Sequence, residues 1–167
     1  MRSNFWIIFL LTLLLVACAS TADLRPGESV IEDVHRTMGA PALRWQDVDG
    51  SSHLAYPHGP EGFETLLVHL GPSGKLQKIE NVLDAEHFAA IKPGMGKEQV
   101  LHLLGPPQPQ WTMYFKARDE LAWEWHYCDD WNAAARFNVL FDATAGTVRS
   151  TISIRENCGK SNCWCAH

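Results

Sequence analysis

Residues 91–107 read IKPGMGKEQVLHLLGPP, and this stretch combines a turn, a short helix and a second turn. Pro93-Gly94 predicts the first turn, and the apolar residues of Lys97–Leu104 recur at helical spacing. Gly105 tolerates the left-handed conformation with which many helices end, and the prolines that follow it prevent the helix from continuing. The stretch therefore predicts a helix of about two turns between two chain reversals.

A weaker copy of this stretch lies near the beginning of the chain. Four features recur in the same order. Pro26-Gly27 corresponds to Pro93-Gly94, Val34 to Val100, Gly39 to Gly105, and Pro41 to Pro107. The correspondence continues beyond the helix, because Trp45 follows Gly39 at the same distance at which Trp111 follows Gly105. We therefore predict an internal repeat of roughly 67 residues.

Each copy is predicted to form a helix followed by a meander of short strands. In the first copy the helix spans Glu28–Met38, and the strands span Leu43–Asp47, His53–Tyr56 and Phe63–Leu70. In the second copy a helix at Asp84–Ala90 precedes Lys97–Leu104, and the strands span Gln110–Phe115, Glu120–Cys128, Ala135–Phe141 and Val148–Arg155. Alternating apolar and polar residues indicate antiparallel sheets with helices on one face and solvent on the other. The predicted fold class is α+β, with two tandem units, each with short helices packed on one face of a three- to four-stranded antiparallel sheet.

The beginning of the chain predicts export and lipid attachment. Arg2 and the apolar run Phe5–Val16 have the form of a secretory signal, which is too short to span a bilayer as a stable helix. The segment Leu15-Val16-Ala17-Cys18 resembles the lipobox of bacterial lipoproteins, which implies that Cys18 is the lipidation site. Ala19 after it favours the outer membrane. Palmitate-type acyl chains, each contributing about 0.8 kcal/mol per buried CH₂, would hold the protein on the membrane. An ordinary signal peptide with an incidental cysteine is the alternative.

These features divide the chain into five parts. The parts are a lipoprotein signal peptide at 1–17, a lipidated tether at 18–24, a first repeat at 25–80, a second repeat at 81–155 and a cysteine-rich tail at 156–167.

The order of turn residues and apolar positions in residues 91–107 resembles the SmpA/OmlA (BamE-like) family of bacterial outer-membrane lipoproteins. The resemblance extends over residues 91–150 and, more weakly, over 25–80. It implies a non-catalytic role as a scaffold or accessory subunit of the cell envelope, with β-barrel assembly components among the candidate partners. The tandem arrangement of two such units is similar to that of β-lactamase inhibitor proteins, which present a concave sheet to a partner.

Composition and motifs exclude several classes of function. The chain has a formal net charge of −5 and no basic cluster, so nucleic acid is not an expected partner. The sequence contains no Gly-x-Ser-x-Gly segment, HExxH segment or nucleotide-binding fingerprint. We interpret Glu124 with His126, and Asp129-Asp130, as solvated charges. The sequence thus predicts a protein that is not an enzyme and has no cofactor.

Aromatic residues supply the candidate partner-binding side chains, although packing at the core or its rim is the alternative for each. The candidates are next to turns or polar residues and are Trp111, Tyr114, Trp131, Trp45 and Tyr56. A different row, Leu121, Trp123, Trp125 and Tyr127, shares one face of a predicted strand, with Glu124 and His126 on the opposite face. We expect Trp123 and Trp125 to lie in the core.

Four cysteines remain after the lipidation site, namely Cys128, Cys158, Cys163 and Cys165. An even number of cysteines in an exported protein predicts two disulfides. Of the three possible pairings, the one with Cys163 bonded to Cys165 is the least expected, because a single intervening residue would strain the ring. Zinc binding by the tail is the alternative. We predict disulfides and no metal.

The combined expectation is a lipid-anchored protein on the periplasmic face of the bacterial outer membrane that binds other envelope proteins without catalysis, in outer-membrane assembly or integrity. The alternative is a membrane-tethered inhibitor-like or ligand-binding module that acts on a periplasmic enzyme and holds its ligand in the concavity between the two copies.

Overall fold

The computed structural model describes residues 21–58, 62–157 and 165. The predicted signal peptide, the predicted lipidation site Cys18, and the cysteines Cys158 and Cys163 lie outside the described residues. Among the helices of the described ranges, none is long and apolar enough to cross a membrane.

The chain forms two four-stranded antiparallel sheets in sequence order, as the fold-class prediction requires. The first sheet contains β1 (Leu43–Gln46), β2 (Ser52–Pro57), β3 (Thr65–Leu70) and β4 (Leu76–Asn81). The second contains β5 (Met113–Phe115), β6 (Glu120–Cys128), β7 (Ala134–Asp142) and β8 (Val148–Arg155). The α-helices are α1 (Ile31–Met38), α2 (Ala85–Ala90) and α3 (Lys97–Leu104), and the 3-10 turns are η1 (Thr21–Asp23), η2 (Pro109–Trp111) and η3 (Lys116–Arg118).

The two units repeat the same local contacts. The N–H of Gly27 donates to Leu76 O at 2.7 Å, and the N–H of Gly94 donates to Val148 O at 2.8 Å. Both α1 and α3 end at a glycine with positive φ, Gly39 at 79° and Gly105 at 69°. Each third strand shifts register near its end, between His69 and Leu70 in the first sheet and between Leu140 and Phe141 in the second. These corresponding features make the units two copies of one helix-and-sheet design.

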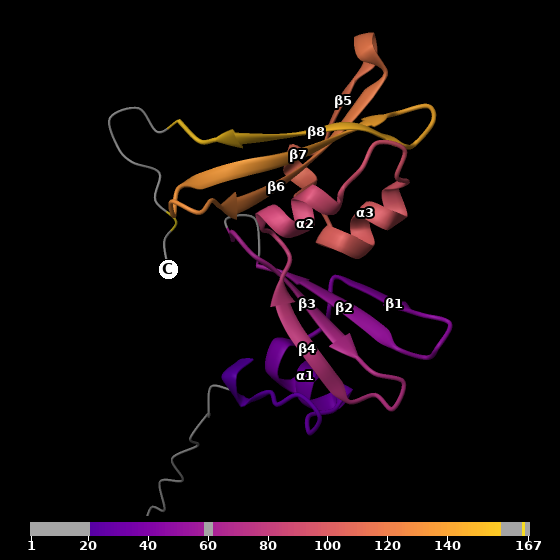
Figure 1. Cartoon of the computed structure of the whole chain (residues 1–167), viewed down its shortest axis with the longest axis vertical. Helices are drawn as coiled ribbons and strands as arrows, with labels where there is room; N and C mark the ends of the chain where they lie inside the picture. Colours follow the sequence, from indigo (N-terminus) through magenta and orange to yellow (C-terminus); the bar gives the residue numbers. More distant parts are fainter. Residues whose placement is uncertain (1–20, 59–61, 158–164, 166–167) are drawn as a thin grey trace, which may run out of the picture.

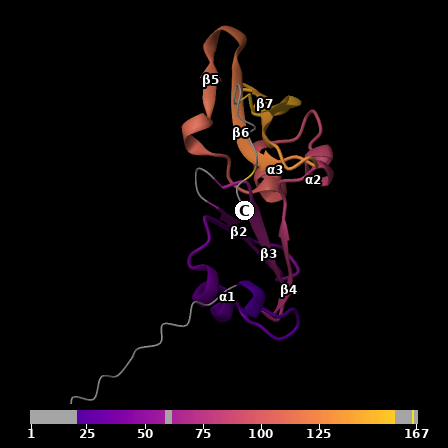
Figure 2. The ribbon, with the colours of Figure 1, turned by 90° about the vertical axis from the view of Figure 1, so that its left-hand side faces the viewer.

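The elements stack in the order α1, first sheet, α2 with α3, second sheet (Figure 1). Figure 2 shows this order from the side, with β5 and β6 projecting past the helices. One buried cluster joins α1 to the first sheet through Val34, Leu54 and Val68. The other cluster takes residues from both sheets and both inner helices: Ala55, Leu67, Val82, Leu83, Phe88, Ile91, Val100, Leu104, Trp125, Phe137, Val139, Phe141 and Val148.

This stacking corrects two expectations. The first sheet carries helices on both faces instead of solvent on one, because Ala55 and Leu67 on its second face are covered by α2 and α3. The space between the two copies is therefore filled by apolar side chains and does not form an open concavity. The segments that signal this are β2 and β3, in which buried residues stand on both sheet faces instead of alternating with exposed ones.

Several elements also differ from the sequence prediction, three of them by more than two residues or by a whole strand. The first sheet has a fourth strand, β4, whose polar residues conceal it from a pattern of apolar alternation. Helix α1 begins at Ile31, because Val30 pairs with Lys75 in a β-bridge and its N–H donates to Asp33 Oδ2 at 3.0 Å. The predicted strand at Gln110–Phe115 is shortened to β5, since Pro109 begins a 3-10 turn.

Candidate functional site

The second sheet has one face buried against the helices and one face turned away from them (Figure 1). Strand β6 alternates, so Trp123 and Trp125 point toward the helices, and Trp125 is only 1% exposed. This confirms the core position expected for Trp125, whereas Trp123 is partly buried and packs against the edge of the core. Glu124 and His126 consequently lie on the opposite face, which we call the outer face.

Strand register places polar residues side by side at the centre of the outer face. Glu124 pairs with Asn138 of β7, and Asn138 pairs in turn with Ile152 of β8. In the next row His126 pairs with Arg136. Glu156, which follows β8, completes what we call the outer-face cluster: Glu124, His126, Arg136, Asn138 and Glu156.

The charges of the outer-face cluster lie close together without short hydrogen bonds at their centre. His126 Nε2 lies 3.7 Å from Glu124 Oε1 and 3.5 Å from Glu156 Oε1. Arg136 donates from Nε to Glu156 Oε1 at 3.1 Å, and its Nη1 is 3.8 Å from Glu124 Oε1. Within the described part of the chain, Glu124 Oε1, His126 Nε2 and Asn138 Nδ2 are buried atoms that make no hydrogen bond of ordinary length, although Asn138 lies close enough to Glu124 to lower the pKa of its carboxyl group. Such atoms cost stability unless something else binds them.

Burial sets the protonation of this cluster. It raises the pKa of Glu124 above its usual value, which Arg136 only partly offsets. Burial also lowers the pKa of His126, although Glu156 acts in the opposite direction. At neutral pH the histidine is thus held in its neutral form, which leaves Arg136 as the cation beside the carboxyl groups of Glu124 and Glu156. The cluster therefore contains more hydrogen-bond acceptors than cations and favours an incoming hydrogen-bond donor.

Two aromatic rings border the cluster. Trp111, placed by η2, stacks on the His126 imidazole with ring centroids 3.7 Å apart. Phe63, from the β2–β3 connection of the first unit, lies 6.3 Å from the same ring. Both units therefore contribute to this end of the outer face, and the rings withdraw the imidazole from water.

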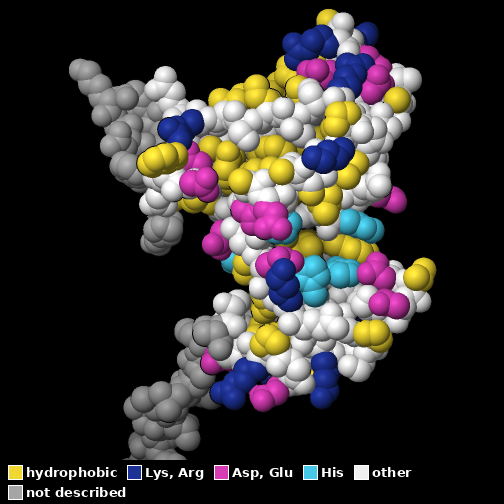
Figure 3. Space-filling model, viewed as in Figure 1, with side chains coloured by type: hydrophobic (Ala, Val, Ile, Leu, Met, Phe, Trp, Pro, Cys, Tyr) yellow, Lys and Arg dark blue, Asp and Glu magenta, His cyan; other side chains and the backbone are white. Residues whose placement is uncertain are grey.

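Apolar side chains lie exposed on both margins of the outer face. Met113 on β5 is 56% exposed, and Ile152 and Ile154 on β8 are 48% and 51% exposed. Figure 3 shows apolar side chains gathered along the upper edge of the second unit. Exposed apolar residues around partly buried polar groups are typical of a protein-binding surface.

A second polar group, which we call the histidine network, lies at the junction of the two units. Its members come from the first sheet and from both inner helices and are Asp47, His53, His69, Glu80, His87 and His102. Figure 3 shows histidines at the waist of the molecule on either side of an apolar band. Trp45 stacks against His102 of α3 with ring centroids 4.6 Å apart, so the network joins the first sheet to the second unit.

The centre of the histidine network is the cross-strand pair of His53 and His69. Their Nδ1 atoms lie 2.8 Å apart, so one ring must donate and the other accept. Asp47 Oδ2 lies 2.7 Å from His53 Nε2, and Glu80 Oε1 lies 2.9 Å from His69 Nε2. Burial and the neighbouring His53 lower the pKa of His69 below its usual value, although Glu80 opposes them. Among the described residues, no group of three or more His, Cys, Asp or Glu side chains is arranged to hold a metal ion.

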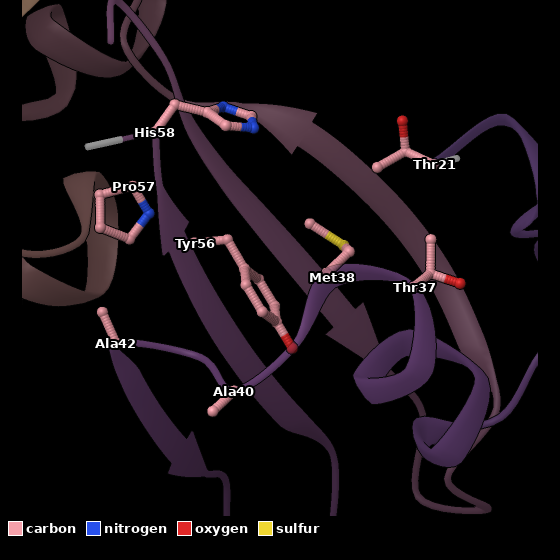
Figure 4. A pocket seen from close by; sticks show the side chains of 8 residues that line it. All are labelled: Thr21, Thr37, Met38, Ala40, Ala42, Tyr56, Pro57 and His58. Carbon is pink, nitrogen blue, oxygen red and sulfur yellow. The ribbon is translucent and has the colours of Figure 1, made fainter. Parts of the chain in front are cut away.

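A cavity of about 430 Å³ lies beside α1 in the first unit. Figure 4 shows the Tyr56 ring lying between Met38 and the segment with Ala40 and Ala42. The Tyr56 hydroxyl donates to Gly39 O at 3.3 Å, and burial raises the pKa of this phenol. The polar groups at its rim come from threonine and histidine, with Thr21, Thr37 and His58 among the lining residues.

The five aromatic candidates do not form one surface. Tyr56 lines the cavity and is 7% exposed, whereas Trp45 packs at the junction. Trp111 borders the outer-face cluster. Tyr114 and Trp131 are 56% and 75% exposed, in β5 and in the β6–β7 turn respectively. The structure brings Trp111 alone among these five into contact with the outer-face cluster.

Several residues of the outer face were not singled out by the sequence interpretation. Arg136, Asn138, Ile152 and Ile154 were not candidates, and Glu124 with His126 was interpreted as a solvated pair. The signal available was the two-residue period of β6 and β7, which places Arg136 and Asn138 in phase with Glu124 and His126 once the strands are paired.

The predicted disulfide framework is confirmed in part. Cys128, at the end of β6, is bonded to Cys165, and the N–H of Cys165 donates to Asn132 O at 3.1 Å. The bond fastens the C-terminal end of the chain beside the β6–β7 turn. Cys158 and Cys163 lie outside the described residues.

The fold defines an α+β protein of two tandem helix-and-sheet units, and no described α-helix packs on the outer face of its second sheet. No family model matches the sequence, and no curated protein matches it. Among solved structures, the chain is similar to an extracellular protein containing an SCP domain from Bacillus anthracis str. Ames, with a TM-score of 0.31 and 9% identity. The match covers 83% of this chain and 46% of that protein, so this chain spans less than half of its length. A similarity of this size carries no argument about function.

Proposed function

We propose that this chain is an acyl-anchored protein of the bacterial outer membrane that binds other envelope proteins without catalysis, through the outer face of its second sheet. The observation that carries the proposal is the state of the outer face. It combines exposed Met113, Ile152 and Ile154 with buried polar atoms that make no hydrogen bond of ordinary length among the described residues. A bound protein would cover the exposed apolar side chains and exclude water from the polar cluster between them.

The location rests on the sequence. The lipobox-like segment ending at Cys18 supports an acyl anchor, and residues 91–107 support a place in the SmpA/OmlA family. A role in outer-membrane assembly or integrity, with β-barrel assembly components among the partners, follows from that resemblance. The described residues begin with η1 in the first unit, whereas the outer face belongs to the second unit. Figure 1 shows α1 and the second sheet at opposite ends of the molecule.

The chemistry of the outer face restricts the partner. Because two carboxyl groups stand beside one guanidinium, a partner that presents an N–H donor or a cationic side chain toward Glu156, the more accessible of the two, is favoured. Trp111 offers a ring of the type that dominates binding energy at interfaces. The partner surface that fits is therefore apolar with a basic or amide group at its centre.

The test is capture of envelope proteins from bacterial membranes by the acylated protein and its variants. Trp111→Ala should lower the recovery of the bound protein by about tenfold or more, because aromatic anchors at interfaces contribute on the order of 2 kcal/mol. Trp131→Ala is the matched control, since it removes the same ring from the β6–β7 turn and should leave recovery unchanged. Equal recovery with native protein and Trp111→Ala would place the contact elsewhere. If mass spectrometry showed a mature product without acyl groups, the proposed acyl anchor would be refuted.

The alternative, a tethered ligand-binding or inhibitor-like module acting on a periplasmic enzyme, is favoured by the cavity at Tyr56. Its volume of about 430 Å³ falls within the range of small-molecule sites. Tyr56→Phe would then weaken ligand binding while Trp111→Ala would not. Capture of a single periplasmic enzyme, retained in Trp111→Ala, would favour this second function over the first.

A further inference from the structure

Strand β8 is a long edge strand that carries little protection against pairing with another strand. It spans Val148–Arg155 and, within the described ranges, pairs with β7 on one side only. Every residue from 149 to 155 is exposed. Its middle, Ser150–Ile154, contains no charged residue and no proline, the two devices that usually block strand addition.

The other edge strands differ from β8. Strand β1 has four residues and β5 has three, which leaves little backbone to pair. Strand β4 carries Lys78 and Glu80, which bond to each other and keep charge at that edge. The second sheet thus has one edge suited to extension.

The two arginines at the ends of β8 are held back toward their own sheet. Arg149 donates from Nη2 to Asp142 Oδ2 at 2.7 Å and from Nη1 to Arg118 O at 2.8 Å. Arg155 donates from Nε to Asp129 Oδ2 at 2.7 Å. Both positive charges are therefore compensated within the chain and do not prevent another strand from pairing with the free edge of β8.

We propose that β8 pairs antiparallel with β8 of a second copy, so that two second sheets join into one continuous sheet. Directly opposite residues in an antiparallel pair share a sheet face, so the two-fold axis must pass through a residue. An axis at Ser153 places Ile152 opposite the second copy's Ile154, and Thr151 opposite its Arg155. All four isoleucines of the pair then meet on the outer face.

Neighbouring registers are less favourable. An axis at Ile152 would place Arg149 opposite the second copy's Arg155 at both ends, and directly opposed like charges destabilise a strand pair. An axis at Ile154 would place Ile152 opposite the second copy's Glu156. The sequence of β8 is therefore self-complementary in the register centred on Ser153. The proposed function does not depend on this pairing, but pairing would join two outer faces into one docking surface.

Cross-linking in membranes that contain the acylated full-length protein tests the register. Ser153→Cys places two cysteines opposite each other on the axis, where Cα atoms about 4.5–5.5 Å apart allow a disulfide. Ser150→Cys is the matched control, with the same residue on the same exposed strand but its two copies about 20 Å apart. We expect on the order of tenfold more covalent dimer with Ser153→Cys than with Ser150→Cys, after the background of the native cysteines is subtracted. Equal dimer yields would overturn the proposed pairing.

A charge exchange tests the same register without cysteines. In Ile152→Lys/Ile154→Lys each lysine faces a lysine of the second copy, and the protein should sediment as a monomer. In Ile152→Lys/Ile154→Glu each lysine faces a glutamate, and the dimer should be retained. Because all these side chains are exposed, both variants should fold. Identical masses for the two variants, or a cross-link from position 153 to a different envelope protein, would overturn a second copy as the occupant.

Discussion

The contact between the two units can be tested with a single methyl group. Helix α3 ends at Gly105, and a Cβ added there would lie 2.7 Å from Thr65 Cγ2 and 3.4 Å from Ala55 Cβ, both in the first sheet. Helix α1 ends at the corresponding Gly39, where an added Cβ would meet nothing within 4 Å. Both glycines have positive φ, at 69° and 79° respectively, so alanine is strained at each.

The two substitutions should therefore differ in cost. Gly39→Ala is expected to lower the free energy of unfolding by about 1–3 kcal/mol, the cost of a side chain in this backbone region. Gly105→Ala pays the same strain and, in addition, about 1–3 kcal/mol for the overlap with Thr65, which is buried and cannot easily move. Urea unfolding of the native protein and both variants measures the difference directly.

Thr65→Ser provides the second arm of the test, because it removes the overlapping methyl and keeps the hydroxyl. Alone it should cost about 1 kcal/mol for the lost buried methyl. Combined with Gly105→Ala it should recover stability relative to the sum of the single changes, with a coupling of about 0.5–3 kcal/mol. Combined with Gly39→Ala it should show no coupling. Equal costs for the two glycine variants, or no coupling in the Gly105 pair, would refute the seating of α3 on the first sheet.

Three further predictions follow from the sites. Burial lowers the pKa of His69 and of His126, so below about pH 6.5 the unfolded chain takes up protons at these histidines that the folded chain does not. The free energy of unfolding should therefore be at its full value above about pH 6.5 and fall as the pH drops below it. His69→Gln and His126→Gln should each reduce the loss of unfolding free energy between pH 7.5 and 5.5 (about one unit either side of the unperturbed value), and an unchanged pH slope would contradict the assignment. Because burial raises the pKa of Glu124, the ionised form of this side chain destabilises the fold. Glu124→Gln should therefore be more stable by about 1 kcal/mol at pH 7, and the gain should fade toward pH 4. A variant that is less stable at pH 7 would oppose this explanation. Cys165→Ser should lower the free energy of unfolding by about 4 kcal/mol, because the disulfide closes a loop of 37 residues and so restricts the unfolded chain. Denaturant unfolding with the other cysteines intact measures this loss. A loss no larger than that of an exposed Ser150→Ala control would show that the bond does not constrain the chain.

Local signals predicted much of the architecture. The turn at Pro93-Gly94, the helix Lys97–Leu104 and the strand Glu120–Cys128 were all expected from the sequence and are present with those boundaries. Capping residues, turn residues and the two-residue period act over a few neighbouring positions, so their effects can be inferred without knowing the rest of the fold. The shared face of Trp123 and Trp125 follows from the same alternation.

The candidate site could be predicted only in part, because it depends on residues that are distant in sequence. Trp111 was a candidate, but nothing local showed that it would stack on His126. Glu124 and Arg136 come together only after β6 and β7 pair. The raised pKa of Glu124 depends on how much protein surrounds the carboxylate, which is a property of the packed molecule.

The sequence by itself determined the repeated helix-and-sheet unit, the residues that share a strand face and the C-terminal ends of the helices, because each depends on steric and hydrogen-bonding preferences of adjacent residues. Only the tertiary structure decided that α2 and α3 cover the second face of the first sheet and that Cys128 bonds to Cys165. The physical reason is that burial of apolar area is non-directional. Which apolar faces meet is then decided by how the whole chain can exclude the most water, and no short segment contains that information.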